Sequence, residues 1–248
     1  MFSAKLIDLP LLRDSVAAIS ELIDEAEIVV RGDSIRIVAS DRAVVSVVDF
    51  FLAKEAFAEY NYEKDMKVGL NLINFLKILK RAAGNDVMEL KITEEKFDIQ
   101  FKGDSVRVFS LPVIDVSRMD LPPIEKLEFP SFFEIKSEIL NSGIDDTDLI
   151  GDSMIINVQS DKLILRSESE TSMAQLELVP NGGMLQSLSS PQASRSRYSL
   201  DYLKKIIKAK KLSDIAKVSL GTDYPMKIVF EIPGKARLSF ILAPRVED

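Results

Sequence analysis

The sequence predicts an α+β protein made of two similar domains. Four stretches have the apolar periodicity of helices, and between them lie runs in which apolar and polar residues alternate as in strands. The helical stretches recur at nearly constant offsets: Leu12 and Leu72 are 60 positions apart, Ile139 and Leu200 are 61 apart, and the two halves are offset by 127 to 128 positions. A strand–helix–strands–helix–strands unit therefore occurs twice.

The first half holds two predicted helices. The stretch LPLLRDSVAAISELI (9–23) follows Asp8 and contains Pro10, residue types that favour a helix start. The stretch NLINFLKILKRAAGN (71–85) contains Gly84, which we expect to stop the helix. The residues predicted to face the core are Leu12, Val16, Ile19 and Ile23 in the first helix and Leu72, Phe75, Leu76 and Leu79 in the second.

The second half holds a short helix and a basic one. The stretch SEILNSGI (137–144) is predicted to end near Gly143, and SLDYLKKIIKAKKL (199–212) carries five lysines. The residues predicted to face the core are Ile139, Leu140 and Ile144 in the former and Leu200, Leu203 and Ile207 in the latter.

The alternating runs predict strands separated by turns such as TEEK, KGDS, QSDK and PGK. Their apolar residues are Met88, Leu90, Ile92, Phe97, Ile99, Phe101, Val106 and Val108 in the first half, and Ile156, Val158, Leu163, Leu165, Met226, Ile228, Phe230, Leu238, Phe240 and Leu242 in the second. This pattern is typical of antiparallel sheets that pack one face on a core.

Two segments are predicted to lie outside the regular elements. The stretch IDVSRMDLPPIEKLEFP (114–130) has three prolines and alternating charge, so we assign residues 1–114 and 129–248 to the two domains and 115–128 to a connecting loop. The stretch 180–197 is rich in Gly, Ser and Pro and is predicted to be a flexible surface loop.

Composition excludes several kinds of chemistry. The 248-residue chain has neither Cys nor His, which excludes disulfides, cysteine–histidine zinc sites, thiol nucleophiles and imidazole acid–base catalysis. It has no apolar run long enough for a membrane span and no basic-then-apolar start, so we expect an intracellular protein.

The basic fourth helix stands out in a chain whose formal net charge is −7. A solvated polar face is one interpretation. Basic residues recur, however, on the exposed side of three of the four helices, and the third is the exception, with Glu134, Lys136 and Glu138 nearby. If the two copies pack alike, their helices collect on one side of the sheets and form a basic wall that binds phosphates without reading sequence.

The stretch GIDDTD (143–148) is the best candidate for a metal site. Asp145, Asp146 and Asp148 could hold Mg²⁺ for phosphoryl transfer. They also follow a predicted helix end, where Asp commonly serves a turn, and this is the favoured interpretation. No P-loop, G-x-G-x-x-G or EF-hand spacing occurs to support an enzyme.

The C-terminal stretch SFILAPRVED (239–248) stays apolar almost to its end. It is either a final strand stopped by proline or an exposed apolar patch kept for a partner.

Five stretches together resemble one known family: LIDEAEIVVRGDSIRIVASDRA, KEAFAEYN, FLKILKRA, SRYSLDYLKKIIKAKKLSD and LSFILAPRVED. They are similar, in the same order from residue 1 to 248, to sliding clamps of the proliferating cell nuclear antigen type, particularly archaeal ones. The resemblance implies the DNA clamp fold and a head-to-tail trimer that closes into a ring of six domains, with helices on the inner face and antiparallel sheets outside.

The resemblance also implies a function. Such a ring is a processivity factor without catalytic activity or cofactor that encircles duplex DNA, is opened by an ATP-dependent clamp loader, and tethers a replicative polymerase, flap endonuclease or ligase. We expect it in the cytoplasm with the nucleoid, or in the nucleus if the source is eukaryotic. The alternatives are a magnesium-dependent phosphoryl-transfer enzyme and a subunit of a heterotrimeric ring.

Three sites follow from the resemblance. The residues expected to border the DNA are Arg13, Lys77, Lys80, Arg81, Lys204, Lys205, Lys208, Lys210 and Lys211. At the subunit interface, Phe109 and Leu111 of VRVFSLPV (106–113) are expected to meet a neighbour's Leu176 and Leu178 of MAQLELV (173–179). The expected pocket for a partner peptide comprises Ser40, Val44, Met119, Leu121, Pro122, Pro225, Ile241, Ala243, Pro244 and Val246. Val44 replaces a histidine common in eukaryotic relatives and Ile241 an aromatic residue, which changes the expected peptide preference.

Overall fold

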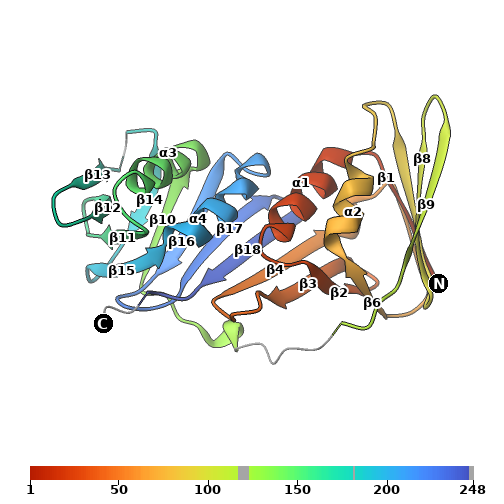
Figure 1. The fold of residues 1–248 in the computed structure, drawn as a ribbon, viewed down its shortest axis with the longest axis horizontal. Coiled ribbons are helices and arrows are strands. Elements are labelled where there is room, and N and C mark those ends of the chain that lie inside the picture. Colours follow the sequence, from red (N-terminus) through yellow and green to blue (C-terminus); the bar gives the residue numbers. More distant parts are fainter. Residues whose placement is uncertain (117–122, 181, 246–248) are drawn as a thin grey trace. The chain divides into compact units, whose positions relative to one another are not determined.

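The computed structural model describes residues 1–116, 123–180 and 182–245 (Figure 1). The chain divides into two compact units. Unit 1 comprises Met1–Asp41, Val48–Asp120 and Ile232–Leu238, and unit 2 comprises Arg42–Val47, Leu121–Glu231 and Ser239–Asp248. No helix in the described ranges is both long and apolar enough to cross a membrane.

The first half of the chain forms antiparallel strands and two helices. The strands are β1 (Phe2–Leu6), β2 (Glu25–Val30), β3 (Ser34–Ser40), β4 (Ser46–Ala53), β5 (Glu59–Tyr62), β6 (Met66–Asn71), β7 (Val87–Ile92), β8 (Lys96–Lys102) and β9 (Val106–Pro112). The helices are α1 (Leu9–Ser20), α2 (Leu72–Leu79) and the short 3₁₀ helix η1 (Lys54–Ala56). The strands order as β5-β1-β7-β8-β9 and β4-β3-β2-β6.

The helices α1 and α2 of unit 1 lie side by side (Figure 1). Each buries one face. The carboxylate of Asp8 accepts a hydrogen bond from the backbone N–H of Leu11 at 3.3 Å, so the predicted start of α1 is confirmed. In α2, Phe75 packs edge-on against Phe97 of β8, with ring centroids 5.2 Å apart. This helix ends at Leu79, so the predicted stop at Gly84 is wrong by five residues.

The second half of the chain repeats this plan. The strands are β10 (Ser131–Lys136), β11 (Ser153–Val158), β12 (Leu163–Glu168), β13 (Met173–Leu178), β14 (Leu185–Ser189), β15 (Ser194–Ser199), β16 (Ile215–Leu220), β17 (Met226–Ile232) and β18 (Ala236–Leu242). The helices are α3 (Ser137–Asp148), α4 (Leu200–Ile206) and the 3₁₀ helices η2 (Ile124–Lys126) and η3 (Ile207–Lys211).

The strand order confirms the internal duplication. The order β5-β1-β7-β8-β9 corresponds term by term to β14-β10-β16-β17-β18, and β6-β2-β3-β4 corresponds to β15-β11-β12-β13. In each half, one helix follows the first strand, β1 or β10, and the other follows the strand that begins the second series, β6 or β15. The predicted α+β class and the tandem copies are therefore confirmed, and the predicted apolar strand residues all fall in β7–β9, β11, β12, β17 and β18.

Helix α3 is longer than the sequence predicts. It continues through Gly143 to Asp148, so GIDDTD is helical and its assignment to a turn is wrong. A Cβ at Gly143 would lie 2.8 Å from Cδ1 of Leu165 and 3.2 Å from Cδ2 of Leu176. Glycine is needed here because the helix lies close against β12 and β13, and not because the helix ends.

The stretch 180–197 is not the flexible loop that its composition predicts. Strands β14 and β15 occupy much of it, and Leu185 is fully buried. Buried serines of this stretch form hydrogen bonds with Ser131: the hydroxyl oxygen of Ser131 lies 2.8 Å from that of Ser190 and 2.7 Å from that of Ser194. Because these hydroxyls satisfy one another, a serine-rich sequence is compatible with a packed strand.

Candidate nucleic-acid interface and partner surfaces

The basic residues of unit 1 lie on α1, on α2 and just after α2. Arg13 on α1 is half-buried, with its Nε 2.9 Å from Oδ1 of Asp14 and its Nη2 3.3 Å from Oδ2, so its charge is largely compensated. Lys77 is exposed on α2, and Lys80 and Arg81 are exposed in the turn that follows it. Cations at this position are also favourable for the helix dipole.

The basic residues of unit 2 lie on α4 and η3. The helix tightens from α to 3₁₀ geometry at Ile207, so the lysines are not spaced at 100° per residue throughout. Lys205, Lys208 and Lys211 are exposed, whereas Lys204 and Lys210 are half-buried. The ammonium group of Lys205 lies 5.6 Å from the ring centroid of Tyr202.

The half-buried lysines form ion pairs. The Nζ of Lys204 lies 2.9 and 3.0 Å from the two carboxylate oxygens of Asp148 on α3, and 3.5 Å from Oδ1 of Asp201. The Nζ of Lys210 lies 2.9 Å from Oε2 of Glu138. The hydrogen bond to Asp148 raises the pKa of Lys204 above its usual value. Sequence reasoning noted the acidic character near the third helix but missed these pairs, because they join residues 56 and 72 positions apart.

The three aspartates of α3 do not converge on a metal. Asp148 pairs with Lys204, and Oδ2 of Asp145 accepts a hydrogen bond from Nδ2 of Asn141 at 2.7 Å. Within the described ranges, no group of three or more acidic side chains is placed to hold a metal ion. Asp145 and Asp148, at i and i+3, share a face of the helix but are engaged by different partners, and Asp146 at i+1 lies on another face.

The two strands assigned to the subunit interface lie at sheet edges. In unit 1, β9 ends the sheet, and no described strand of that unit covers its outer edge; the same holds for β13 in unit 2. Phe109 and Leu111 are half-buried on one face of β9, with the ring centroid of Phe109 6.0 Å from that of Phe101. Leu176 is half-buried and Leu178 is buried on β13. Val108, predicted as an apolar strand residue, is 64% exposed on the opposite face of β9.

A charge pair anchors β9 within its own unit. Arg107 on β9 forms an ion pair with Asp86, and its Nη1 donates to the carbonyl oxygen of Arg81 at 2.7 Å. A hydrogen bond from the N–H of Ala83, together with Arg107, lowers the pKa of Asp86 below its usual value. The carboxylate is therefore charged at neutral pH, and it ties the edge strand to the turn after α2.

The residues assigned to the peptide pocket are only partly described. Met119, Leu121, Pro122 and Val246 lie outside the described residues, and Ser40 is buried at the end of β3 in unit 1. In unit 2, Ala243 donates its N–H to the carbonyl oxygen of Val45 at 2.9 Å, and Pro225, Ala243 and Pro244 are half-buried. Ile241 is buried on β18, so the first part of the apolar C-terminal stretch, residues 239–242, is the end of a strand.

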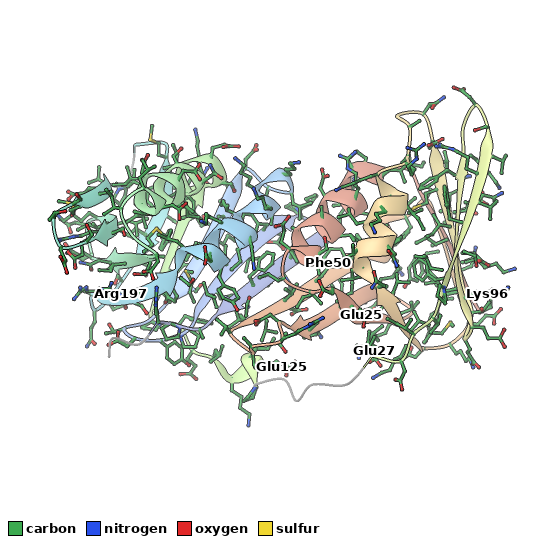
Figure 2. The ribbon with its side chains drawn as sticks, viewed as in Figure 1. Glu25, Glu27, Phe50, Lys96, Glu125 and Arg197 are labelled. Carbon is green, nitrogen blue, oxygen red and sulfur yellow. The ribbon has the colours of Figure 1, made fainter. Side chains whose placement is uncertain are left out.

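Val44 and a cavity are the remaining features of this region of unit 2. Val44 is 46% exposed and has a φ of 56°, a conformation that is strained for a β-branched residue and is typical of functional loops. The cavity has a volume of about 360 Å³. Its lining is Ile155, Arg195, Ser196, Arg197, Thr222, Asp223, Pro244 and Arg245, of which Arg197 is labelled in Figure 2.

The fold and these surfaces define a two-domain α+β binding protein with exposed cations on its helices and open edges on its sheets. Comparison with known proteins identifies the family. Residues 1–120 match the family model of the N-terminal domain of proliferating cell nuclear antigen, and residues 123–245 match that of its C-terminal domain. The chain belongs to this family of DNA polymerase sliding clamps, and the matches support the clamp function and not the phosphoryl-transfer alternative.

Individual relatives agree with this assignment. The chain is 35% identical over 248 residues to the DNA polymerase sliding clamp of Methanothermobacter thermautotrophicus (100% of this chain, 99% of the relative) and 32% identical to that of Thermococcus fumicolans (95% and 94%). Among solved structures, the fold is similar to PCNA of Thermococcus kodakaraensis (TM-score 0.91, 24% identity, 99% of this chain and 100% of that one). It is also similar to a PCNA2–PCNA3 complex of Sulfolobus tokodaii (TM-score 0.90, 28% identity, 99% and 100%).

Proposed function

We propose that the chain assembles into a ring that encircles duplex DNA and tethers a replicative polymerase to it. The observation that carries this proposal is the set of exposed cations on the helices of each unit and, in unit 1, in the turn after α2. These are Lys77, Lys80 and Arg81 in unit 1 and Lys205, Lys208 and Lys211 in unit 2. Lysines on long side chains attract phosphates without reading bases. A ring lined by them stays attached through its topology and remains able to slide.

The ring requires an interface that repeats head to tail. The open edges of β9 and β13 are different surfaces, as a heterologous interface needs. Pairing of these edges would satisfy their backbone groups and complete the burial of Phe109, Leu111 and Leu176. We propose a homotrimer, and a heterotrimer that contains this chain is the alternative. We place the assembly in the cytoplasm, on the nucleoid.

Stimulation of a polymerase tests the function. With a clamp loader, ATP and a primed circular template, the protein is expected to lengthen the products of its partner polymerase because the tethered enzyme stays on the DNA. Product length is read on a denaturing gel, with the loader alone as control. If products have the same length with and without the protein, the tethering role is wrong.

Partner enzymes are proposed to dock through a short peptide whose aromatic residues enter an apolar site. The described residues that support it in unit 2 are Val44, Pro225, Ala243 and Pro244. Aromatic plugs typically supply most of the binding energy at such sites. We expect the peptide to be part of the replicative polymerase, flap endonuclease, ligase and clamp loader.

Replacing Pro244 tests this surface. Pro244→Ala is expected to lower the affinity for a synthetic peptide with two adjacent aromatic residues by about fivefold to tenfold, since a hot-spot contact contributes at least about 1 kcal/mol. The measurement is titration calorimetry. Leu149→Ala is the control, because Leu149 is 83% exposed at the end of α3 in the same unit. If the Pro244→Ala variant binds the peptide with wild-type affinity, Pro244 is not part of the peptide site.

A further inference from the structure

We infer that two acidic residues of α3, Asp148 and Glu138, act as built-in competitors of DNA phosphate. They form ion pairs with Lys204 and Lys210, so fewer lysines of unit 2 are available to contact DNA than its sequence contains. This inference rests on the proposed DNA-binding function and concerns how strongly the same surface holds its ligand.

The geometry separates the lysines of unit 2 into two groups. Lys204 contacts both oxygens of Asp148 at 2.9 and 3.0 Å, and Lys210 contacts Glu138 at 2.9 Å. Their side chains are 39% and 27% exposed, respectively. No such carboxylate contact is found among the described residues for Lys205, Lys208 or Lys211, which are all exposed.

The charges of the helix pair balance. Helix α4 and η3 contain five lysines and Asp201, whereas α3 contains four acidic residues and no Lys or Arg. The five positive charges are therefore matched by five negative ones, and the formal charge of the helix pair is zero. The lysine-rich segment is basic as a sequence but lies beside its own counter-ions in the fold, since α3 contacts both α4 and η3.

These ion pairs are weak enough for DNA phosphate to compete with the carboxylates for the lysines. Partly exposed ion pairs contribute at most about 1 kcal/mol, so a phosphate can displace the carboxylate from the lysine. The displaced carboxylate nevertheless stays within the screening length of about 8 Å and repels the phosphate. The net gain from contacting Lys204 or Lys210 is therefore small. Attachment depends on Lys205, Lys208 and Lys211, which keeps the ring's hold weak enough for sliding.

Neutral, nearly isosteric replacements test the inference. Asp148→Asn combined with Glu138→Gln is expected to tighten binding of a linear duplex by about tenfold at physiological salt and to steepen the dependence of log K on log salt, because released lysines gain phosphate contacts. Fluorescence anisotropy across a range of salt concentrations measures both quantities. Glu231→Gln together with Glu177→Gln is the matched control. Those carboxylates lie on β17 and β13 of the same unit and pair with Lys217 at 2.9 Å and Lys162 at 3.2 Å. Their replacement changes the net charge by the same amount.

Replacement of the lysines provides a second test. Lys204→Gln with Lys210→Gln alone would leave Asp148 and Glu138 unpaired, so these changes are combined with Asp148→Asn and Glu138→Gln. This set, which removes both ion pairs without changing the net charge, is expected to lower the affinity less than twofold, whereas Lys205→Gln with Lys208→Gln is expected to lower it by about tenfold. Equal losses for the two variants would overturn the inference. So would an unchanged affinity in the acid variant, or an equal gain in the control.

Failure of the proposed function would look different. If Lys205→Gln with Lys208→Gln leaves DNA binding unchanged, this face does not hold DNA and the proposed function is wrong. If that variant loses affinity while the acid variant gains none, the DNA-binding role stands and only the competition by α3 is wrong.

Discussion

Glutamate at Phe109 and Leu111 of β9 is expected to convert the assembled protein into single chains that remain folded. Both side chains are half-buried at the open edge of their sheet, so a neighbour's strand would complete their burial. Burying two carboxylates without partners in that contact costs several kcal/mol per interface, more than a closed trimer tolerates. Sedimentation equilibrium gives the mass, and far-ultraviolet circular dichroism reports the fold.

The opposite face of the same strand supplies the control. Val108 is 64% exposed, so Val108→Glu places its charge in water and should leave the assembled mass unchanged. If Phe109→Glu with Leu111→Glu unfolds unit 1, Leu176→Glu on β13 makes the same test from the other edge. A wild-type mass in both of these variants would contradict an interface between β9 and β13.

Charge reversal on one helix of each unit is expected to produce the second large effect. Lys77→Glu with Lys208→Glu should lower the affinity for duplex DNA by about tenfold or more at physiological salt and flatten its salt dependence, because each lost phosphate contact removes about 0.9 from the slope. The assembled mass should not change, since neither residue lies on β9 or β13. Anisotropy with a labelled duplex measures the affinity, and primer extension measures the loss of stimulation.

The control variant changes the net charge by the same amount, at residues that lie on strands. Lys96 on β8, labelled in Figure 2, and Lys227 on β17 are strand residues, one in each half of the chain. Lys96→Glu with Lys227→Glu should cost much less affinity if the helices are the DNA-facing elements. An equal loss in both double variants would indicate a response to net charge and would count against a DNA-binding helix surface.

The sequence was a good guide to features that depend on local periodicity. The helix start at Asp8 and the alternating residues of β7 and β8 follow from patterns within one or two elements, and the duplication follows from the recurrence of such patterns at a constant offset. These patterns determine which face of an element is apolar. That information was sufficient for the α+β class and for the tandem domains.

The errors concern features that depend on packing. Gly143 looked like a helix stop, although it permits close contact between α3 and Leu165. Serines of the stretch 180–197 looked like loop residues, although Ser131 and its hydrogen-bonded partners satisfy one another inside unit 2. The pair between Lys204 and Asp148 joins residues 56 positions apart, so no local pattern could indicate it. The domain boundaries and the assigned binding residues stay predictions.

Retention on a linear duplex with blocked ends tests most directly whether DNA is held by enclosure. The protein is incubated with a long duplex whose ends are open, the ends are then blocked with a bulky protein, and the complex is washed at high salt, which removes electrostatic contacts. A ring should remain on DNA blocked after incubation and should be lost from DNA left open. It should fail to load on DNA blocked beforehand. Equal retention on all three substrates, or on none, would contradict a ring that encloses the double helix.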